Sequence, residues 1–262
     1  GMANLGLVKL APRIRRNARK LRGMPLSISV AVVAKSKKET CEGAIIDAKN
    51  AVLYIIQHNL AQMIEINISC PNVGGVPFAE PRMLDKLLTV LDKLERDMPF
   101  FVKMPYMENM KHFDMLLRVI SRHNIQGVTV ANLIKERDNL HLSDPLPETV
   151  RGGLSGIPTR AHNVEMIRHA YQFYGDRLII IGVGGIFSAQ DAYEKIRAGA
   201  SLVALVTGMI FEGPQVVGRI NRELVALLQK DGFHTISEAV GADYKKRAKK
   251  STKSSQKPLQ KM

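Results

Sequence analysis

Six short stretches of this chain are apolar or alternate between apolar and polar residues, which is typical of β-strands. In the clearest of them, Met63 to Ser69, isoleucines alternate with Glu65, Asn67 and Ser69. Successive side chains of a strand point to opposite faces, so the isoleucines share one face and the polar residues share the other. The predicted strands are residues 26–33, 63–69, 100–104, 126–131, 178–182 and 202–206.

Between these strands, apolar residues recur at the spacing that puts them on one face of a helix. The predicted helices are residues 39–60, 82–96, 111–123, 160–174, 188–198 and 214–230, and the fifth begins with Ser188 and Asp191 at capping-box spacing. Alternating strands and helices predict a parallel sheet with right-handed crossovers. Six strands suffice for an open, doubly wound sheet, whereas a (β/α)8 barrel needs eight, so the count alone favours the open sheet.

A basic amphipathic helix is predicted over residues 7–21. Its apolar face carries Leu7, Leu10, Ile14, Ala18 and Leu21 among lysines and arginines. One interpretation places this helix on an anionic membrane. The modest apolar face and Pro12 favour the other interpretation, an outer helix of the domain.

The polar face of residues 63–69 is unusual, because a strand buried on both faces is normally apolar throughout. It therefore predicts a wall that contacts something polar. Cys70 follows where the strand gives way to a loop, and α/β folds bind ligands in the loops at the carboxyl ends of their strands. The plainer interpretation of Cys70 is a small buried residue beside turn-forming asparagines.

Two glycine turns follow the last two strands, at Gly182-Val-Gly-Gly-Ile186 and at Val206-Thr-Gly208. The first lacks the third glycine of a dinucleotide fingerprint and comes too late in the chain for one. Each turn alone could simply connect buried strands. Paired glycine turns after the last two strands are also what a barrel uses to hold a phosphate through backbone N–H groups. Together they predict a phosphate-bearing cofactor and a barrel without its first two strands.

Composition and charge fit a globular protein of 262 residues with 45% hydrophobic and 24% charged residues. The net charge of +14 lies at the ends, since residues 1–22 carry seven basic residues and residues 244–262 carry eight, and neither segment has an acid. We therefore predict one domain over residues 1–243 and a basic disordered tail over 244–262. No signal peptide or membrane span is evident. Cys41 and Cys70 have neither disulfide nor metal-site spacing, so no metal is expected.

Six ordered motifs resemble those of the dihydroorotate dehydrogenase family. They are Asn67-Ile-Ser-Cys-Pro-Asn72, Val102-Lys103, Gly152-Gly-Leu-Ser-Gly-Ile-Pro158, Ile180-Ile-Gly-Val-Gly-Gly-Ile186, Lys195-Ile-Arg-Ala-Gly-Ala-Ser201 and Gly241-Ala-Asp243. The resemblance implies an FMN-binding (β/α)8 TIM barrel, here lacking its first two strands, and oxidation of (S)-dihydroorotate to orotate in pyrimidine (UMP) biosynthesis. The 152–156 turn and the 241–243 ending look like the quinone-using class, whereas Cys70 looks like the soluble class. A quinone is the favoured acceptor, and the expected location is the cytoplasm or the periphery of the inner membrane.

Roles for individual residues are implied by the same resemblance. Cys70 would be the catalytic base, and the substrate would be bound by Asn67, Asn72, Asn132 and Leu133. The FMN contacts would be Ser29, Asn67, Lys103, Ala131, Ser155, Gly156, Gly184, Gly185, Val206 and Thr207. Lys103 would place positive charge beside the flavin, although a lysine at a strand end can also extend to solvent. The chain departs from the family at Ser29, Ala131, Leu133 and Val206, where other residues are usual.

Several alternatives remain at the level of sequence. Residues 1–6 resemble the second half of a family motif, so we expect a fragment of a longer parent, or a chain whose missing strands come from a partner; an inactive remnant is the other possibility. Another FMN-barrel oxidoreductase is the alternative within enzymes. Nucleic-acid or anionic-surface binding through the basic ends is disfavoured, because these ends lack interleaved aromatic residues and the body of the chain is close to neutral.

Overall fold

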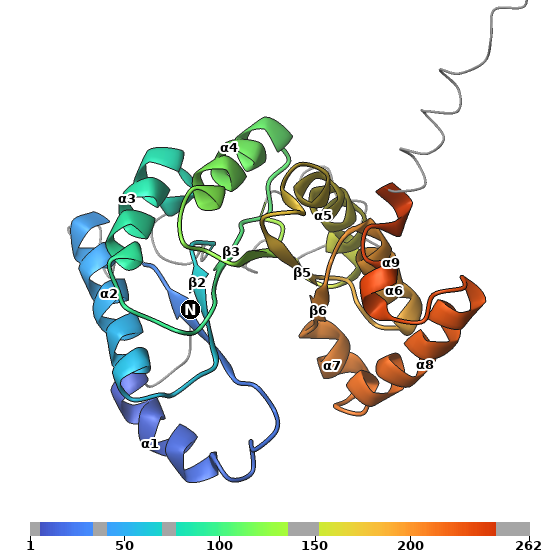
Figure 1. The fold of residues 1–262 in the computed structure, drawn as a ribbon, viewed down its shortest axis with the longest axis horizontal. Coiled ribbons are helices and arrows are strands. Elements are labelled where there is room, and N and C mark those ends of the chain that lie inside the picture. The colour runs from blue at the N-terminus through green and yellow to red at the C-terminus, as the bar shows by residue number, and fades with distance from the viewer. Residues whose placement is uncertain (1–5, 34–40, 70–76, 136–151, 245–262) are drawn as a thin grey trace, which may run out of the picture. The chain divides into compact units, whose positions relative to one another are not determined.

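The computed structural model describes residues 6–33, 41–69, 77–135 and 152–244. These belong to two compact units, residues 1–153 and residues 154–262. Each unit is built from alternating strands and helices (Figure 1).

Unit 1 is organised around four parallel strands. They are β1 (Ser27–Ala31), β2 (Met63–Asn67), β3 (Phe100–Lys103) and β4 (Gly127–Val130), and they pair in that order. The unit also contains α1 (Leu7–Asn17), α2 (Cys41–Gln57), the short 3₁₀ helix η1 (Pro77–Ala79), α3 (Pro81–Asp92) and α4 (Met110–Ser121). In Figure 1, α2, α3 and α4 lie along the outside of the strands, so each strand has one face covered by helices.

The core of unit 1 lies between those helices and the isoleucine face of β2. Ile64 and Ile66 are fully buried, and Ile68, just beyond the strand, is 1% exposed. Helix α3 presents Leu84, Leu87, Leu88 and Leu91 to this core, a spacing that puts all four on one face. The helix begins after Glu80, whose carboxylate accepts a hydrogen bond from the Met83 amide at 3.0 Å. The alternation predicted for residues 63–69 is confirmed.

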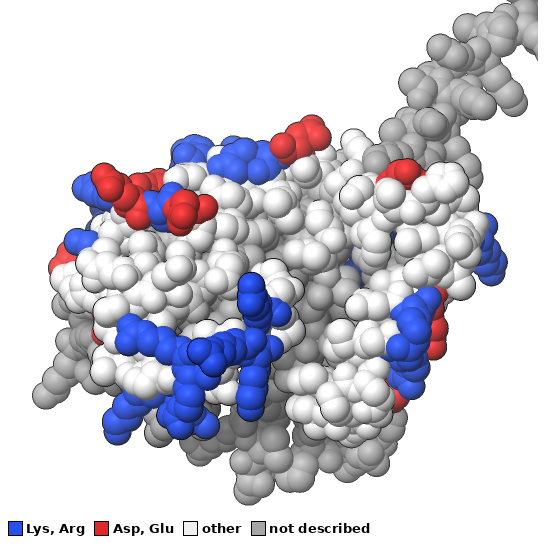
Figure 2. Space-filling view, turned by 60° about the horizontal axis from the view of Figure 1, so that its bottom comes forward, with Lys and Arg blue, Asp and Glu red and all other residues white. Residues whose placement is uncertain are grey.

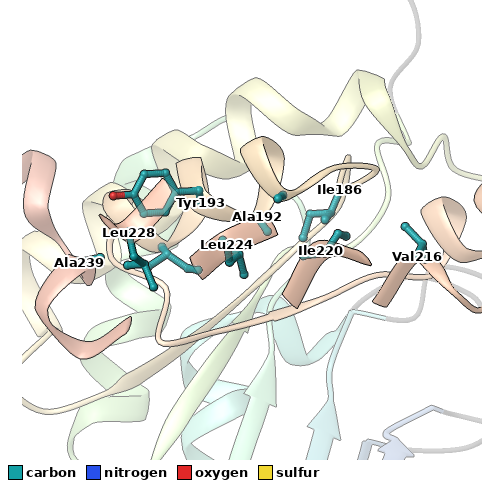
Figure 3. Close-up of a cluster of buried hydrophobic side chains, with 10 residues drawn as sticks. Ile186, Ala192, Tyr193, Val216, Ile220, Leu224, Leu228 and Ala239 are labelled. Carbon is teal, nitrogen blue, oxygen red and sulfur yellow. The ribbon is translucent and has the colours of Figure 1, made fainter. Parts of the chain in front are cut away.

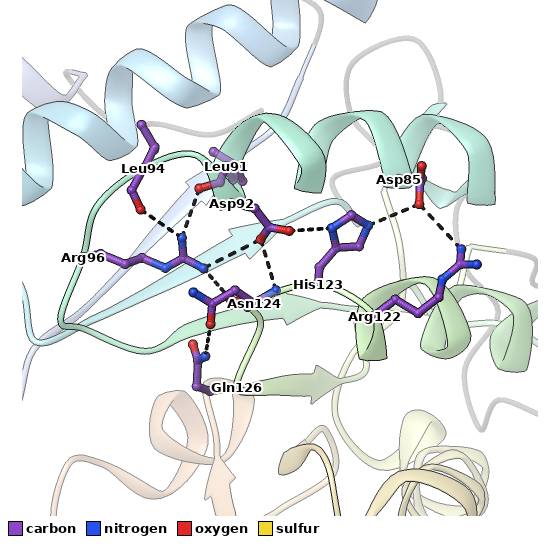
Figure 4. Close-up of polar contacts among 9 residues, drawn as sticks. All are labelled: Asp85, Leu91, Asp92, Leu94, Arg96, Arg122, His123, Asn124 and Gln126. Atoms are coloured by element: carbon purple, nitrogen blue, oxygen red, sulfur yellow. Dashed lines mark hydrogen bonds and ion pairs between the residues drawn. The ribbon is translucent and has the colours of Figure 1, made fainter.

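A polar cluster joins the ends of α3 and α4 near the amino ends of β3 and β4 (Figure 4). The Arg96 side chain is 2% exposed, and its guanidinium lies 3.9 Å from the centre of the Phe100 ring. Its N–H groups donate to the backbone carbonyls of Leu91, Leu94 and Asn124. Burial lowers the pKa of Arg96, and the Asp92 carboxylate partly offsets this. The helix predicted to reach Arg96 therefore ends at Asp92, and Arg96 instead donates to the Leu91 carbonyl in its last turn and to two carbonyls beyond it.

The imidazole of His123 lies between two carboxylates of the same cluster. Its Nδ1 is 2.7 Å from Asp92 Oδ2, and its Nε2 is 3.2 Å from Asp85 Oδ1. Asp92 also accepts from the Asn124 amide at 3.1 Å. These contacts fix α3 against α4 at the end of the strands opposite to Asn67 and Lys103.

Unit 2 contains the parallel pair β5 (Ile179–Val183) and β6 (Leu202–Ala204). Its helices are η2 (Ile157–Thr159), α5 (Arg160–Tyr174), α6 (Ala189–Ala198), α7 (Thr207–Glu212), α8 (Val216–Lys230) and α9 (Ile236–Ala239). Figure 3 shows the apolar cluster that joins α6 to α8. Ala192, Tyr193 and Ile196 of α6 contribute to it, together with Ile220 and Leu224 of α8. The predicted capping box is confirmed, because the Ser188 side chain accepts from the Asp191 backbone N–H and the Asp191 side chain accepts from the Ser188 backbone N–H.

The α/β class and all six predicted strands are confirmed, with strand ends that differ by one or two residues. The described residues hold six strands, so they support parallel α/β architecture but not a closed eight-stranded barrel. Within them, β1 pairs only with β2 and β6 only with β5. The short helices α7 and α9 were not predicted, because neither is long enough to display a helical period. In the part of the chain that the structure describes, no helix has the length and apolar character to cross a bilayer.

Candidate active site

The loop that follows β2 begins with a short hydrogen-bonded turn. Asn67 Oδ1 accepts from the Ser69 amide at 3.0 Å and from Ser69 Oγ at 2.6 Å. Ser69 is 3% exposed and Asn67 is half-buried. An asparagine that bonds the backbone two residues on is a turn-forming arrangement, which here occupies the carbonyl end of the Asn67 amide. The Nδ2 hydrogens of Asn67 have no partner among the described residues.

Asn132 connects the end of β4 to this turn. Its Nδ2 donates to Ser69 O at 2.7 Å and to Ser69 Oγ at 2.8 Å, which uses both amide hydrogens. Its backbone N–H donates to Met104 O at 3.1 Å. The open groups are therefore a donor on Asn67 and an acceptor, Oδ1, on Asn132. This pair is complementary to a planar ligand with an acceptor and a donor at its edge, such as a cyclic amide.

Lys103 lies in the same row of the sheet as Asn67. The register pairs Asn67 with Lys103 and Lys103 with Thr129, and residues paired across parallel strands point to the same face. Lys103 is half-buried, and within the described residues no ion pair involves its ammonium group. Beyond Thr129, Ala131 is 3% exposed. Leu133 packs against Gly153, where a Cβ would lie 2.6 Å from Leu133 Cβ.

Glu65 shows that part of the polar face is satisfied within the sheet. Its carboxylate accepts from Ser29 Oγ at 2.8 Å and from Thr129 Oγ1 at 2.7 Å. At Glu65 the polar contacts expected of this face come from within the protein, from side chains on β1 and β4. Ser29 is exposed and spends its hydroxyl hydrogen on Glu65, so a role in binding flavin remains a prediction. Sequence analysis missed Thr129, because its contact with Glu65 spans 64 residues.

The glycine turns of unit 2 are brought together with the 152–156 turn. Ser155 Oγ lies 2.9 Å from Thr207 Oγ1. Gly156 has φ +78°, and a Cβ there would lie 3.1 Å from Thr207 Cγ2. A Cβ on Gly185 would lie 3.1 Å from the Gly156 carbonyl oxygen. Val206, by contrast, is 63% exposed. Within unit 2, the two glycine turns therefore lie close to each other and to Ser155 and Gly156.

No side chain fits at the turn after β5. Gly184 has φ +91°, and a Cβ there would lie 2.5 Å from Thr159 Oγ1; Gly185 has φ +67°, and its Cβ would lie 2.7 Å from Arg160 Cβ. The turn thus presents bare backbone, as phosphate-binding loops do. Behind it, Asn163 is fully buried and its Oδ1 has no partner among the described atoms.

Arg160 fixes this turn and was missed at the level of sequence. Its Nε donates to Gly185 O at 3.1 Å, and its guanidinium pairs with Asp191. Asp191 also accepts from the amides of Phe187 and Ser188 at 2.9 Å. The only signal in the sequence was the capping box, which gave Asp191 a local partner but no distant one.

A family model described as dihydroorotate dehydrogenase matches residues 1–228. The chain belongs to the dihydroorotate dehydrogenase family. The resemblance drawn from the six motifs is thereby confirmed at the level of the family.

Relatives named dihydroorotate dehydrogenase (quinone) are similar along most of the chain. The protein from Nostoc punctiforme is 33% identical over 253 residues, and the one from Myxococcus xanthus is 34% identical over 251; each match covers 94% of this chain. The chain spans 66% of the length of these two relatives. The ligand-free dihydroorotate dehydrogenase structure from Eimeria tenella has a TM-score of 0.75 and 26% identity, and the match covers 91% of this chain and 71% of that one.

Cys70 and Asn72, which the resemblance implies as the catalytic base and a substrate contact, lie outside the described residues. The nearest described neighbour is Ser69, which the Asn67 and Asn132 amides hold in place. Cys41, at the start of α2, is a free and half-buried thiol. Where the structure describes the chain, no three His, Cys, Asp or Glu side chains gather as metal ligands.

Proposed function

We propose that this chain carries the FMN and substrate sites of an enzyme that oxidises dihydroorotate to orotate and passes the electrons to a quinone. Family membership supports the reaction, and the names of the relatives support the acceptor. The structural observation that carries the proposal is the Asn67–Ser69–Asn132 array directly before Cys70, with Lys103 in the same row.

FMN fits the residues that each unit offers. In unit 2, the bare turn at Gly184 and Gly185 suits a phosphate, and Ser155, Gly156 and Thr207 would complete its hydrogen bonds. In unit 1, Lys103 and Asn67 would contact the flavin ring, with Ser29 and Ala131 as further contacts and Val206 of unit 2 as another. When bound, FMN would supply the acceptor for the two electrons that leave the substrate. The positive charge of Lys103 would favour the electron-rich reduced ring.

The substrate would be oriented by amides whose polarity is already set. Asn67 offers a donor and Asn132 an acceptor, and the edge of a dihydropyrimidine ring carries both a carbonyl and an N–H group. Asn72 and Leu133 would complete the contacts. Cys70, as thiolate, would take the proton from C5 of the substrate; an ordinary thiol has a pKa of about 8.5, so a neighbouring positive charge would assist.

Replacement of the proposed base tests the reaction. With FMN added to saturation, the Cys70→Ala variant should bind as much flavin as the parent chain but lose bleaching of the flavin absorbance when dihydroorotate is added without oxygen. Cys41→Ala is the matched control, because it removes the other thiol from the start of α2, and it should bleach at the rate of the parent chain. Bleaching of Cys70→Ala at the parent rate would exclude Cys70 as the base.

We further propose that an additional polypeptide segment pairs with the edge strands β1 and β6 in the active protein. Support comes from β6, which pairs on one side only within the described residues and is followed by exposed Val206, Ile210 and Phe211. These three apolar side chains are 63% to 77% exposed, and a segment that covers them would remove them from water. The absorbance spectrum of the purified 262-residue chain tests this. Little bound flavin is expected from the chain alone; one FMN per monomer would contradict the need for a further segment.

A further inference from the structure

A pocket of about 430 Å³ lies in unit 1, beside α1 and the turn that follows it. It is lined from two sides, by residues of the segment from Ile14 to Leu26 and by the loop at Asn59, Leu60 and Gln62. Leu26 and Gln62 directly precede β1 and β2, and Gln62 Oε1 accepts from the Leu26 amide at 2.9 Å. The pocket is therefore at the amino ends of these strands, away from Asn67 and Lys103 at the carboxyl ends.

The inside of the pocket is aliphatic. Ile14, Leu21, Leu26 and Leu60 line it, and no aromatic ring does. The helix predicted to reach residue 21 ends at Asn17, so Leu21 lies in the turn that follows α1. The apolar side of the helix and turn is not fully covered, because Leu7, Leu10, Ile14 and Leu21 are all only half-buried. Ala11 is the one fully buried residue of the helix. An apolar helix face that borders an open space fits an apolar ligand group better than it fits a finished core.

The rim of the pocket is strongly positive. Arg15 and Arg22 line it, and both are exposed. Five more basic residues of the same segment are also exposed: Lys9, Arg13, Arg16, Arg19 and Lys20. Residues 6–33 include no acid, and among the described residues none of these seven side chains forms an ion pair. Figure 2, which brings the α1 side of Figure 1 forward, shows these charges as a blue group on that face.

We propose that α1 and this pocket form a binding site for anionic phospholipid at a bilayer surface. Arg15 and Arg22 would bind the phosphate of one lipid, part of whose acyl chain would enter the aliphatic pocket, and the other five cations would face neighbouring headgroups. Seven cations along one segment exceed what a single free fatty acid or phosphate needs, so the array fits a surface of negative charge. Nucleic acid fits less well, because single strands bind on aromatic rings that this pocket lacks.

Flotation of the full chain with vesicles tests the proposal. We expect binding to vesicles of equal parts phosphatidylcholine and phosphatidylglycerol, and none to phosphatidylcholine alone. Two double variants with the same change in charge separate the pocket from general attraction: Arg15→Gln/Arg22→Gln at the pocket, and Arg13→Gln/Arg19→Gln on the same segment away from it. The second pair should weaken binding roughly tenfold, and the pocket pair should weaken it roughly tenfold further. The C-terminal tail is present in all variants and contributes equally.

A second pair of variants tests acyl insertion without a change in charge. Ala18→Phe places a ring in the pocket, whereas Asn17→Phe adds the same ring at an exposed site outside it. Binding that survives high salt should be lost in Ala18→Phe and kept in Asn17→Phe. Equal losses in the two charge pairs, or no effect of Ala18→Phe, would reduce the site to diffuse charge and overturn the proposal. Absence of binding to anionic vesicles, or salt-sensitive binding to a DNA oligonucleotide in its place, would also overturn it.

Discussion

The side-chain amide of Asn132 donates to Ser69 O at 2.7 Å and to Ser69 Oγ at 2.8 Å. Because Ser69 Oγ in turn donates to Asn67 Oδ1 at 2.6 Å, one serine sets the orientation of both amides. Without such partners, the amide group at the end of an asparagine side chain can turn over. A reversed amide would present the wrong group to a ligand. The polarity of the candidate substrate site thus depends on a residue that is not expected to touch the substrate.

Removal of that hydroxyl should disturb substrate binding more than cofactor binding, because both amides would contact the substrate but only Asn67 would contact FMN. We expect Ser69→Ala to weaken orotate binding by roughly tenfold, since two side-chain hydrogen bonds, each contributing about 1 kcal/mol, are lost from the amides. FMN content should fall less, because Asn67 is only one of several proposed FMN contacts. Titration of the holoprotein with orotate measures the effect. Ser121→Ala is the control, because Ser121 Oγ bonds only the Arg118 carbonyl at a helix end; an equal loss in both variants would contradict a role in orientation.

We expect FMN retention to depend on the absence of side chains in the turn after β5. Gly185→Ala should lower the FMN bound per folded chain severalfold, because the added Cβ would lie 2.7 Å from Arg160 Cβ and would displace the turn. Gly232→Ala separates this from backbone strain. Gly232 has φ +77°, close to the +67° of Gly185, but has no atom within 4 Å of its Cβ position. Both variants should lose about 1–2 kcal/mol of stability from strain, and only Gly185→Ala should lose FMN.

Lys195 predicts a dependence of stability on pH. It is fully buried in α6, its Nζ has no partner among the described atoms, and burial lowers its pKa from 10.5 to about 8, against a raising effect of Glu194. Between these values the unfolded chain binds the proton and the folded chain does not, so this residue makes stability rise as the pH increases from about 8 to 10.5. Below that window the buried charge costs on the order of 3 kcal/mol.

The Lys195→Met variant isolates this contribution, because methionine fills similar space without a charge. The free energy of unfolding of the variant should exceed that of the parent chain most below pH 8, and the difference should shrink towards pH 10.5. Urea titrations at several pH values measure it. A difference that does not change with pH would mean that the amine keeps its ordinary pKa in the folded chain, and would contradict the prediction.

Loss of the buried guanidinium of Arg96 should lower the stability of the fold strongly (Figure 4). Arg96→Leu would leave three backbone carbonyls and Asp92 without this donor, and should cost about 2–4 kcal/mol of stability. Arg118→Leu is a control of the same chemistry. Its side chain is 71% exposed and pairs only with Asp114 at 3.4 Å, so its loss should cost less than about 1 kcal/mol. Comparable costs would contradict the capping role of Arg96.

Local periodicity predicted the strands and the polar face of residues 63–69, because a period of two needs only a few neighbouring residues. The contacts that give that face its chemistry join distant residues. Glu65 meets Thr129 only through the register of β2, β3 and β4, which no local pattern encodes. Lys195 is another case, because a lysine between glutamate and isoleucine in a helix is expected on the solvent face, and only the packing of α6 buries it. The family motifs located the glycine turns, but not Arg160, which holds one of them.

The contacts of Arg160 have a kinetic consequence. Its guanidinium joins the Gly185 carbonyl to Asp191, and Asp191 is held in turn by two backbone amides at the start of α6. The turn therefore loses its conformational freedom when the chain folds, and none of that entropy has to be lost again when an anion arrives. Association of an anion with this turn should consequently proceed in a single phase whose rate rises linearly with anion concentration, without the plateau that a slow ordering step would impose.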